Sequence, residues 1–109
     1  MKSTKFVVAA VLATGLGLST TANALDGEKL FSSPTKGGCS ACHGKDANTP
    51  LMPMYPKLAG QNAAYIVQQM KDIKSGARNN GMTVAMKGIM HMVNDAEIEA
   101  IAKYLSELK

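Results

Sequence analysis

Cys39-Ser40-Ala41-Cys42-His43 is the stretch around which the rest of this 109-residue chain must be arranged. Residues three apart lie on one face of a helical turn, so the two thiols point to the same side. Two thiols at this spacing, followed at once by an imidazole, form the c-type haem attachment pattern. The stretch therefore predicts one covalent haem c, bound through thioethers to Cys39 and Cys42, with His43 as an axial ligand of the iron.

Two other interpretations of the cysteine pair fit the chain less well. A thioredoxin-like redox pair is expected within a βαβ unit, and the chain has no strand pattern. A structural zinc site requires four ligands, whereas the chain has two Cys and two His. The second histidine, His91, is far along the sequence from the cysteines.

The first 24 residues have the composition of a secretory signal peptide. Lys2 and Lys5 give a basic start, residues 6–18 are apolar, and Ala22-Asn23-Ala24 is a small-x-small cleavage site. A membrane anchor is the alternative, but a spanning helix needs about 20 apolar residues. We therefore expect residues 1–24 to be removed on export to the periplasm, with residues 25–109 forming one domain and no stable membrane insertion.

The charge and composition of the chain limit its function. Removal of Lys2 and Lys5 would lower the formal net charge from +4 to +2. No basic block or interleaved aromatic pattern indicates nucleic-acid binding. A domain this short, with no Trp and few other aromatic residues, can bury only a modest core. A buried haem would supply the missing apolar volume.

Three segments have apolar residues at helical spacing, and each is preceded by an N-cap residue. The N-caps are Asp26, Asn62 and Asn94, and the last of these opens a capping box completed by Glu97. Gly76 follows the second segment and is suited to end a helix. The sequence contains no repeat and no alternating strand pattern. We predict an all-α fold with helices over residues 26–32, 62–75 and 95–108.

Two further segments are unusual in composition. Residues 44–60 contain Pro50, Pro53 and Pro56, and a long loop in a small domain is commonly functional. A stiff loop of this kind suits the edge of a haem, with Tyr55 and Leu58 as candidate wall residues. Residues 77–93 are rich in methionine, a residue that fills gaps in cores and also ligates soft metals. The methionines in that segment are Met82, Met86, Met90 and Met92.

The sequence from residue 25 onward resembles the class I cytochromes c. The likeness lies in the Cys-x-x-Cys-His motif near the start, a Met well downstream, and helices at both ends. Gly27 and Phe31 are similar to the Gly and aromatic pair of the family's first helix. Ile101, Tyr104 and Leu105 are similar to the contact set of its last helix. The resemblance implies that these two helices cross closely and that loops wrap the haem.

A closer likeness is to the small bacterial periplasmic branch that also supplies the halves of periplasmic dihaem cytochromes. Tyr55-Pro56-Lys57-Leu58-Ala59-Gly60-Gln61 is similar to the signature of that branch, and residues 86–105 match its spacing without a gap. The register implies that Met86 is the sixth iron ligand, with Met82, Met90 and the bis-His candidate His91 as rivals. The chain departs from the branch in the extra stretch from Ser33 to Gly38.

The same resemblance implies a hydrogen bond that orients the axial histidine. In the family a proline carbonyl after the haem motif accepts the Nδ1 proton of that histidine, which fixes the ring. Pro53, two residues before Tyr55, is the matching position, and Pro50 is the fallback.

These expectations favour a soluble periplasmic electron carrier rather than an enzyme. Its partners would be redox proteins, namely a quinol-oxidising donor complex and a terminal oxidase or reductase, and it would be a monomer or weak dimer. The alternatives are a gas-binding sensor with an open distal site and a haem subunit of a larger oxidoreductase. Lysines expected near the haem edge would dock an acidic partner or simply be solvated. They are Lys36, Lys45, Lys57 and Lys87.

Overall fold

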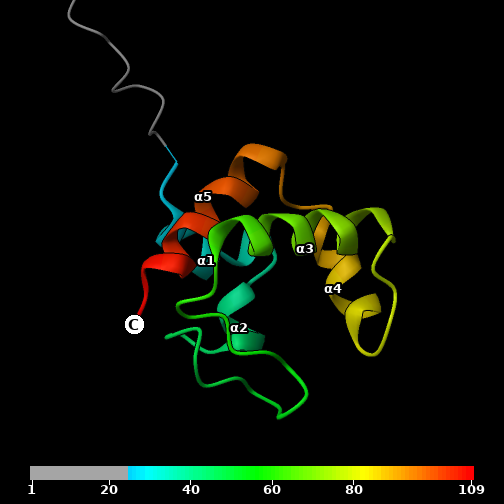
Figure 1. Ribbon diagram of the computed structural model, residues 1–109, viewed down its shortest axis with the longest axis horizontal. Coiled ribbons are helices and arrows are strands. Elements are labelled where there is room, and N and C mark those ends of the chain that lie inside the picture. The colour runs from blue at the N-terminus through cyan, green and yellow to red at the C-terminus, as the bar shows by residue number, and fades with distance from the viewer. Residues whose placement is uncertain (1–24) are drawn as a thin grey trace, which may run out of the picture.

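The computed structural model describes residues 25–109, and this part of the chain is helical without any strand (Figure 1). The predicted signal peptide, residues 1–24, lies outside the described residues. The elements in chain order are α1 (Gly27–Ser32), the 3-10 helix η2 (Pro34–Lys36), α2 (Cys39–His43), α3 (Ala63–Ser75), α4 (Thr83–Met90) and α5 (Asp95–Glu107). The predicted all-α class is confirmed. Within residues 25–109, no helix has the length and apolar character needed to cross a membrane.

The three helices predicted from capping signals are confirmed, together with their N-caps. Asp26 accepts a hydrogen bond from the N–H of Lys29 at 3.1 Å, and Asn62 caps α3 in the same way. At α5 the capping box is complete, because Asn94 accepts from the N–H of Glu97 at 2.8 Å and Glu97 accepts from the N–H of Asn94 at 3.0 Å. These local bonds satisfy helix N–H groups that would otherwise lack partners.

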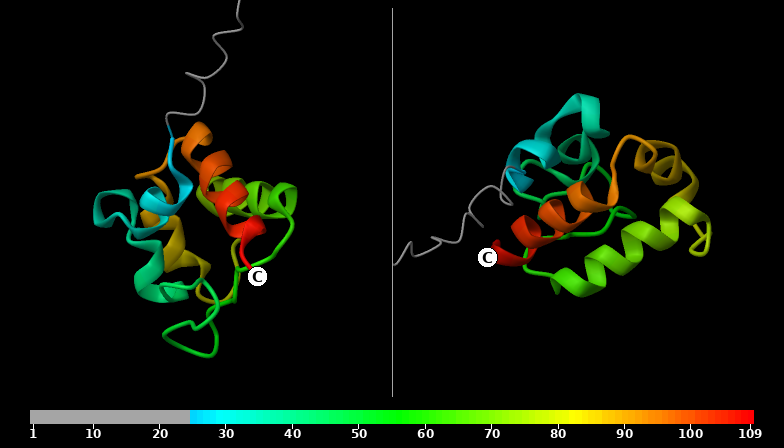
Figure 2. Two further views of the ribbon diagram at one scale, coloured as in Figure 1. Left: turned by 90° about the vertical axis from the view of Figure 1, so that its left-hand side faces the viewer. Right: turned by 90° about the horizontal axis from the view of Figure 1, so that it is seen from above.

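Helices α1 and α5 cross in direct contact, as the resemblance implied (Figure 2). Gly27 makes the crossing possible, since a Cβ atom there would lie 2.2 Å from the carbonyl oxygen of Ala100. Next to it the rings of Phe31 and Tyr104 pack with centroids 5.9 Å apart and a tilt of 52°.

The buried side chains form one cluster between α1, α3 and α5 and the C-terminal end of α4. Burial of apolar side chains is the main stabilising term of such a small domain, at roughly 25 cal/mol per Å². The largest fully buried residues are Phe31, Met90, Val93, Ile98, Ile101 and Leu105.

Helix α4 was not predicted from the sequence. Its N-cap position is Met82, which makes no side-chain capping bond, and the helix contains Thr83, Val84 and Gly88, which have weak helix propensity. The helix is held by packing against α3, and this tertiary contact cannot be predicted from the sequence of α4 alone.

Residues 44–62 join α2 to α3 as a folded loop around the buried Ala47. The carbonyl of Ala47 accepts hydrogen bonds from the N–H groups of Leu58 at 2.7 Å and Ala59 at 3.1 Å. The end of the loop is tied to the last helix, because the N–H of Gly60 donates to the carbonyl of Leu105 at 2.9 Å. The loop therefore has a defined course along one side of the molecule (Figure 1).

Candidate haem site

The Cys-x-x-Cys-His stretch forms the short helix α2, as expected for residues that must share one face. Cys39 and Cys42 are both half-buried, are not joined in a disulfide, and line the same cavity. Burial raises the pKa of the Cys39 thiol, and the neighbouring Cys42 adds to the increase. Reactive cysteines of thioredoxin-like pairs have a lowered pKa, so this environment disfavours that interpretation.

His43 is buried and held in a single orientation. Its Nδ1 lies 2.9 Å from the carbonyl oxygen of Pro56. A carbonyl can only accept, so Nδ1 carries the proton and donates it, which leaves Nε2 unprotonated and able to ligate a metal.

The prediction that the Pro53 carbonyl orients His43 is wrong, and Pro56 takes this role. The three prolines of the loop are spaced by three residues, and a turn between Met52 and Tyr55 intervenes before Pro56. The path of the backbone, rather than the count from the haem motif, selects the carbonyl that faces the ring. Neither Pro53 nor the fallback Pro50 lines the cavity.

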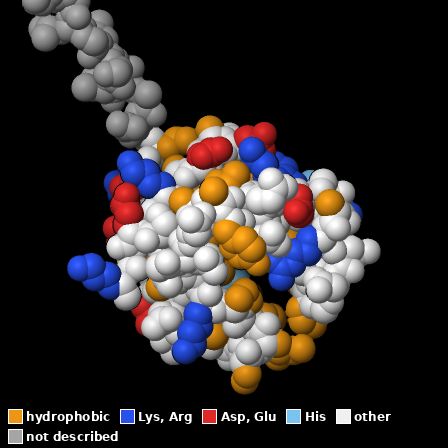
Figure 3. Space-filling model, in the orientation of Figure 1, with side chains coloured by type: hydrophobic (Ala, Val, Ile, Leu, Met, Phe, Trp, Pro, Cys, Tyr) orange, Lys and Arg blue, Asp and Glu red, His pale blue; other side chains and the backbone are white. Residues whose placement is uncertain are grey.

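A cavity of about 420 Å³ lies beside α2 and is bounded by α3, α4 and the 44–62 loop. Figure 3 shows a hollow on this side of the molecule that is bordered by hydrophobic side chains. Tyr55 and Leu58 line it, as expected of wall residues. A concave, mostly apolar space of this size is typical of a cofactor site.

The distal segment places three methionines along the cavity. Met82, Met86 and Met90 recur every four residues, so they follow one face of α4, and all three line the cavity. Their burial differs: Met82 is 41 % exposed, Met86 is half-buried, and Met90 is 2 % exposed within the core cluster. His91 and Met92 are exposed and do not line the cavity.

Polar residues at one end of the cavity were not singled out by the sequence analysis. Arg78 lines the cavity, and its Nη1 donates to the side-chain oxygen of Gln69 at 3.0 Å. Asn80 also lines the cavity. The signal that could have found them is the helix end at Gly76, since residues that follow a left-handed C-cap turn back toward the helix they leave.

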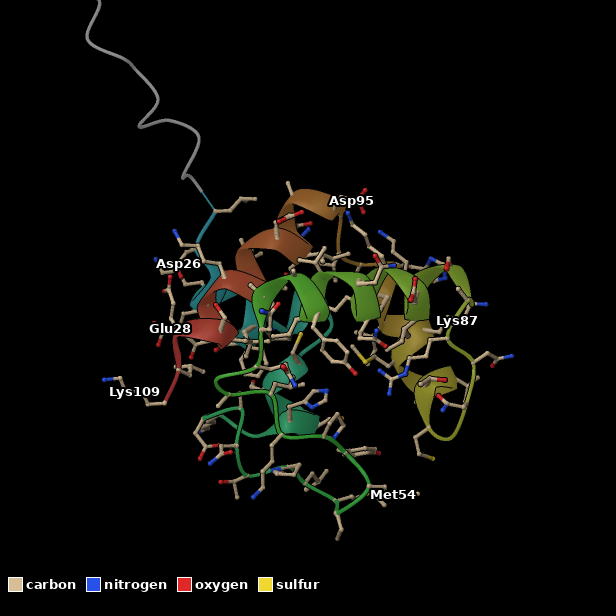
Figure 4. The ribbon with its side chains drawn as sticks, in the orientation of Figure 1. Asp26, Glu28, Met54, Lys87, Asp95 and Lys109 are labelled. Carbon is tan, nitrogen blue, oxygen red and sulfur yellow. The ribbon has the colours of Figure 1, made fainter. Side chains whose placement is uncertain are left out.

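The four predicted lysines have different surroundings. Lys57 lines the cavity, and Lys36 is paired with Glu97. Lys87 is part of α4 and its side chain lies close to Gly76 at the end of α3, and Figure 4 shows it on the outside of the molecule. Lys45 is exposed and does not line the cavity.

The residues around the cavity fit a c-type haem. Two cysteine sulfurs on one helical face would bond to the porphyrin, and an imidazole with a free Nε2 together with a thioether-bearing helix would supply the donor set of the iron. Within residues 25–109, no three His, Cys, Asp or Glu side chains are grouped as a zinc site would require.

Comparisons with known proteins agree with this arrangement. The profile of the family described as Cytochrome c matches residues 24–109. The chain is 42 % identical over 71 residues to cytochrome c4 of Pseudomonas aeruginosa, and this aligned region covers 65 % of this chain and 33 % of that protein. It is 37 % identical over 112 aligned positions to the thiosulfate dehydrogenase electron acceptor of Stutzerimonas stutzeri, covering 99 % of this chain and 50 % of that protein.

A solved structure shows the same fold. The reduced recombinant cytochrome c4 from Pseudomonas stutzeri superposes with a TM-score of 0.67 at 35 % identity, over 76 % of this chain and 46 % of that one. The chain thus spans a third to a half of the length of these relatives and corresponds to one haem-binding half. With the family profile, the attachment motif and the fold in agreement, this chain belongs to the cytochrome c family and carries covalently bound c-type haem.

Proposed function

We propose that this chain is a one-electron carrier whose single haem is ligated by His43 and Met86. One observation carries the proposal: a single cavity is lined by the attachment residues of α2 and by Met86 of α4. When bound, the haem supplies an iron that changes between its ferrous and ferric states by one electron. A redox protein named as an electron acceptor among the relatives supports the same function.

The side chains around the cavity determine how readily the electron is gained. The Pro56 carbonyl bound to His43 fixes the ring and increases its basicity as a ligand. A thioether such as that of Met86 is a soft, neutral ligand, which favours the reduced state and raises the potential. Because Met86 would fill the sixth position, we expect the chain to transform no substrate.

The ligand assignment is tested by single substitutions to alanine. Met86→Ala should abolish the weak ferric charge-transfer band that reports sulfur ligation. The matched variants Met82→Ala and Met90→Ala should keep it. Loss of the band in the Met90 variant alone would move the ligand by one turn of α4, and a spectrum changed by a His91 variant alone would indicate bis-His ligation.

We also propose that residues 1–24 direct export to the periplasm and are then removed. The basic start, apolar run and small-x-small site support this. Protein purified from the periplasm of a host that matures c-type cytochromes should have the mass of residues 25–109 plus one haem. A mass that retains residues 1–24 would contradict cleavage.

The proposed partners are redox proteins on either side of the carrier. A quinol-oxidising complex and a terminal oxidase or reductase are one pair, and a thiosulfate-oxidising enzyme is a further donor class, supported by the name of one relative. Weak, short-lived contacts suit such exchange. Lys57 at the cavity edge is positioned to steer an acidic partner, which would make the rate depend on ionic strength.

The carrier function is tested against the gas-binding alternative with two reactions. Reduced protein should not bind carbon monoxide at low concentration and should be reoxidised rapidly by an oxidase or reductase from the same cell. Tight carbon monoxide binding together with slow reoxidation would support an open-site sensor instead.

A second candidate function, a haem subunit held within a larger oxidoreductase, is favoured by exposed apolar side chains. Leu51, Met54 and Val84 are each more than 60 % exposed. Figure 4 shows Met54 at the outer bend of the loop, away from the helices. A lasting partner would cover such residues. Co-purification of the chain with a fixed stoichiometric partner at high salt would support this candidate over a free carrier.

A further inference from the structure

The extra stretch from Ser33 to Gly38, which joins α1 to α2, lies beside the connection between α4 and α5, as both views of Figure 2 show. Its Lys36 Nζ lies 2.9 Å from Oε2 of Glu97 and 3.2 Å from Oε1. The Glu97 side chain is 6 % exposed and that of Lys36 is 36 % exposed. No other ion pair joins two elements in the part of the chain that the structure describes.

A second contact lies next to this ion pair. Gly37 has a φ of +98°, and a Cβ atom there would lie 2.1 Å from Cγ2 of Ile89. The backbone of the extra stretch thus rests directly on a side chain of α4, three residues after Met86. We refer to the Lys36–Glu97 pair and the Gly37–Ile89 contact together as the clasp.

The side of the clasp formed by Lys36 and Gly37 is connected by backbone hydrogen bonds to the haem-attachment helix α2. The N–H groups of Lys36 and Gly38 both donate to the carbonyl of Ser33, at 3.1 and 3.0 Å, which closes a compact turn. The carbonyl of Gly38 then accepts from the N–H of Ala41 at 2.9 Å inside the attachment motif. The backbone at Lys36 is therefore tied to the start of α2 by these hydrogen bonds.

The side of the clasp formed by Glu97 and Ile89 is connected to the C-terminal end of α4. Glu97 is anchored by the capping box with Asn94. Asn94 lies only four residues after Met90, at which α4 ends. Between them the buried Val93 is held by a hydrogen bond from Nζ of Lys74 to its carbonyl. The opposite end of α4 has no side-chain cap, and its Val84 is exposed, so the clasp end is the more firmly held.

We propose that the clasp fixes α4 relative to the attachment helix and so holds the Met86 sulfur on the iron. Lys36 and Glu97 are positioning residues, because Lys36 acts through α2 and Glu97 through the connection between α4 and α5, and neither touches the ligand. The inference rests on the proposed ligation by Met86. Outward movement of α4 that releases Met86 must separate the Gly37–Ile89 contact, and the Lys36–Glu97 pair at the start of α5 restrains the connection through which α4 would move.

The test measures how fast imidazole replaces Met86 in the ferric holoprotein, followed as loss of the sulfur charge-transfer band. At saturating imidazole this rate equals the rate at which Met86 leaves the iron. The variant is Lys36→Met with Glu97→Gln, since Gln at this position preserves the capping box while removing the ion pair. We expect the saturating rate to rise about tenfold, which corresponds to about 1.4 kcal/mol.

Three further variants separate positioning from other effects. Lys29→Met removes one lysine charge at an exposed position of α1 and should leave the rate unchanged. Asp26→Ala removes the N-cap of α1 and lowers the stability of the whole domain without touching the clasp, so the rate should again be unchanged. Lys36→Arg keeps the ion pair and should have the wild-type rate. If the double variant yields no holoprotein, Lys36→Gln alone takes its place in the test.

The outcomes distinguish this inference from the proposed function. A band that Met86→Ala removes, together with an unchanged rate in the clasp variants, would overturn the clasp and leave the ligation in place. An equal acceleration in Asp26→Ala would also overturn it, because the effect would then arise from general destabilisation. A wild-type protein without the band would overturn the Met86 ligation and the clasp with it.

Discussion

Gly27 is the residue on which the crossing of α1 and α5 depends. Its missing side chain leaves room for the carbonyl of Ala100, which a Cβ atom would approach to 2.2 Å. We predict that Gly27→Ala destabilises the protein by about 2 kcal/mol, because overpacking a close contact forces the backbone apart. Thermal unfolding should report a melting temperature lower by about 10 °C.

The matched control for this prediction is Gly88 in α4. A Cβ atom there meets no atom within 4 Å. Gly88→Ala should therefore raise the stability by about 0.5–1 kcal/mol through helix propensity alone. Equal effects of the two substitutions would show that the Gly27 contact does not constrain the crossing.

Glu97 is a buried carboxylate whose environment favours the charged form. The hydrogen bond from the Asn94 N–H, then the Lys36 ammonium and the charge of Lys74, lower its pKa below the ordinary value of 4.5. A depressed pKa contributes stability that is present above pH 4.5 and is lost as the pH falls through the folded-state pKa.

We predict that Glu97→Gln flattens the acid side of the stability profile. Melting temperatures of the wild type should fall more steeply below pH 4.5 than those of the variant, because only the wild type must protonate this carboxylate. Glu99→Gln, on an exposed position of the same helix, is the control and should keep the wild-type slope. A variant slope equal to that of the wild type would contradict a stabilising role of the charged form.

At the scale of elements, the 44–62 loop is the segment that brings Pro56 to His43. Ala47 is its centre: the side chain is fully buried and the backbone has a φ of +56°, a left-handed conformation. We predict that Ala47→Val destabilises the holoprotein by at least about 2 kcal/mol, because a β-branched residue is strained in that region and has no space. Denaturant unfolding measures the change.

Ala47→Gly is the appropriate comparison, since Gly adopts a positive φ without strain. It removes one methyl group and should change the stability by less than about 1 kcal/mol. A valine variant as stable as the glycine variant would mean that the loop rearranges around position 47 at little cost.

At the scale of the whole molecule, the cofactor space is large compared with the domain. Leaving about 420 Å³ empty would cost up to about 10 kcal/mol at 24 cal/mol per Å³, similar to the entire stability of a small domain. We predict that protein lacking haem, made as the Cys39→Ser/Cys42→Ser variant, is largely unfolded. Far-UV circular dichroism should show reduced helix content without a cooperative melting transition, whereas the holoprotein melts cooperatively.

Several features of this protein follow from short-range sequence signals. The capping residues Asp26, Asn62 and Asn94 predict where three helices begin, because the bonds they make span only three residues. The order Cys39, Cys42, His43 predicts the haem for the same reason, since one helical turn brings the three side chains together. The all-α class follows from these signals and from the missing strand pattern.

Other features depend on contacts between residues far apart in the chain. Helix α4 forms although it lacks a capping residue, since packing on α3 compensates for its weak propensity. The carbonyl that orients His43 belongs to Pro56 rather than Pro53, because the turn after Met52 redirects the loop. The Lys36–Glu97 pair joins residues 61 positions apart, and only the tertiary fold brings their charges together. Hydrogen bonds between residues close in the chain can be predicted from the sequence, because they depend on local spacing. The contacts of loops and uncapped helices depend on how the whole chain packs, and only the tertiary structure determines them.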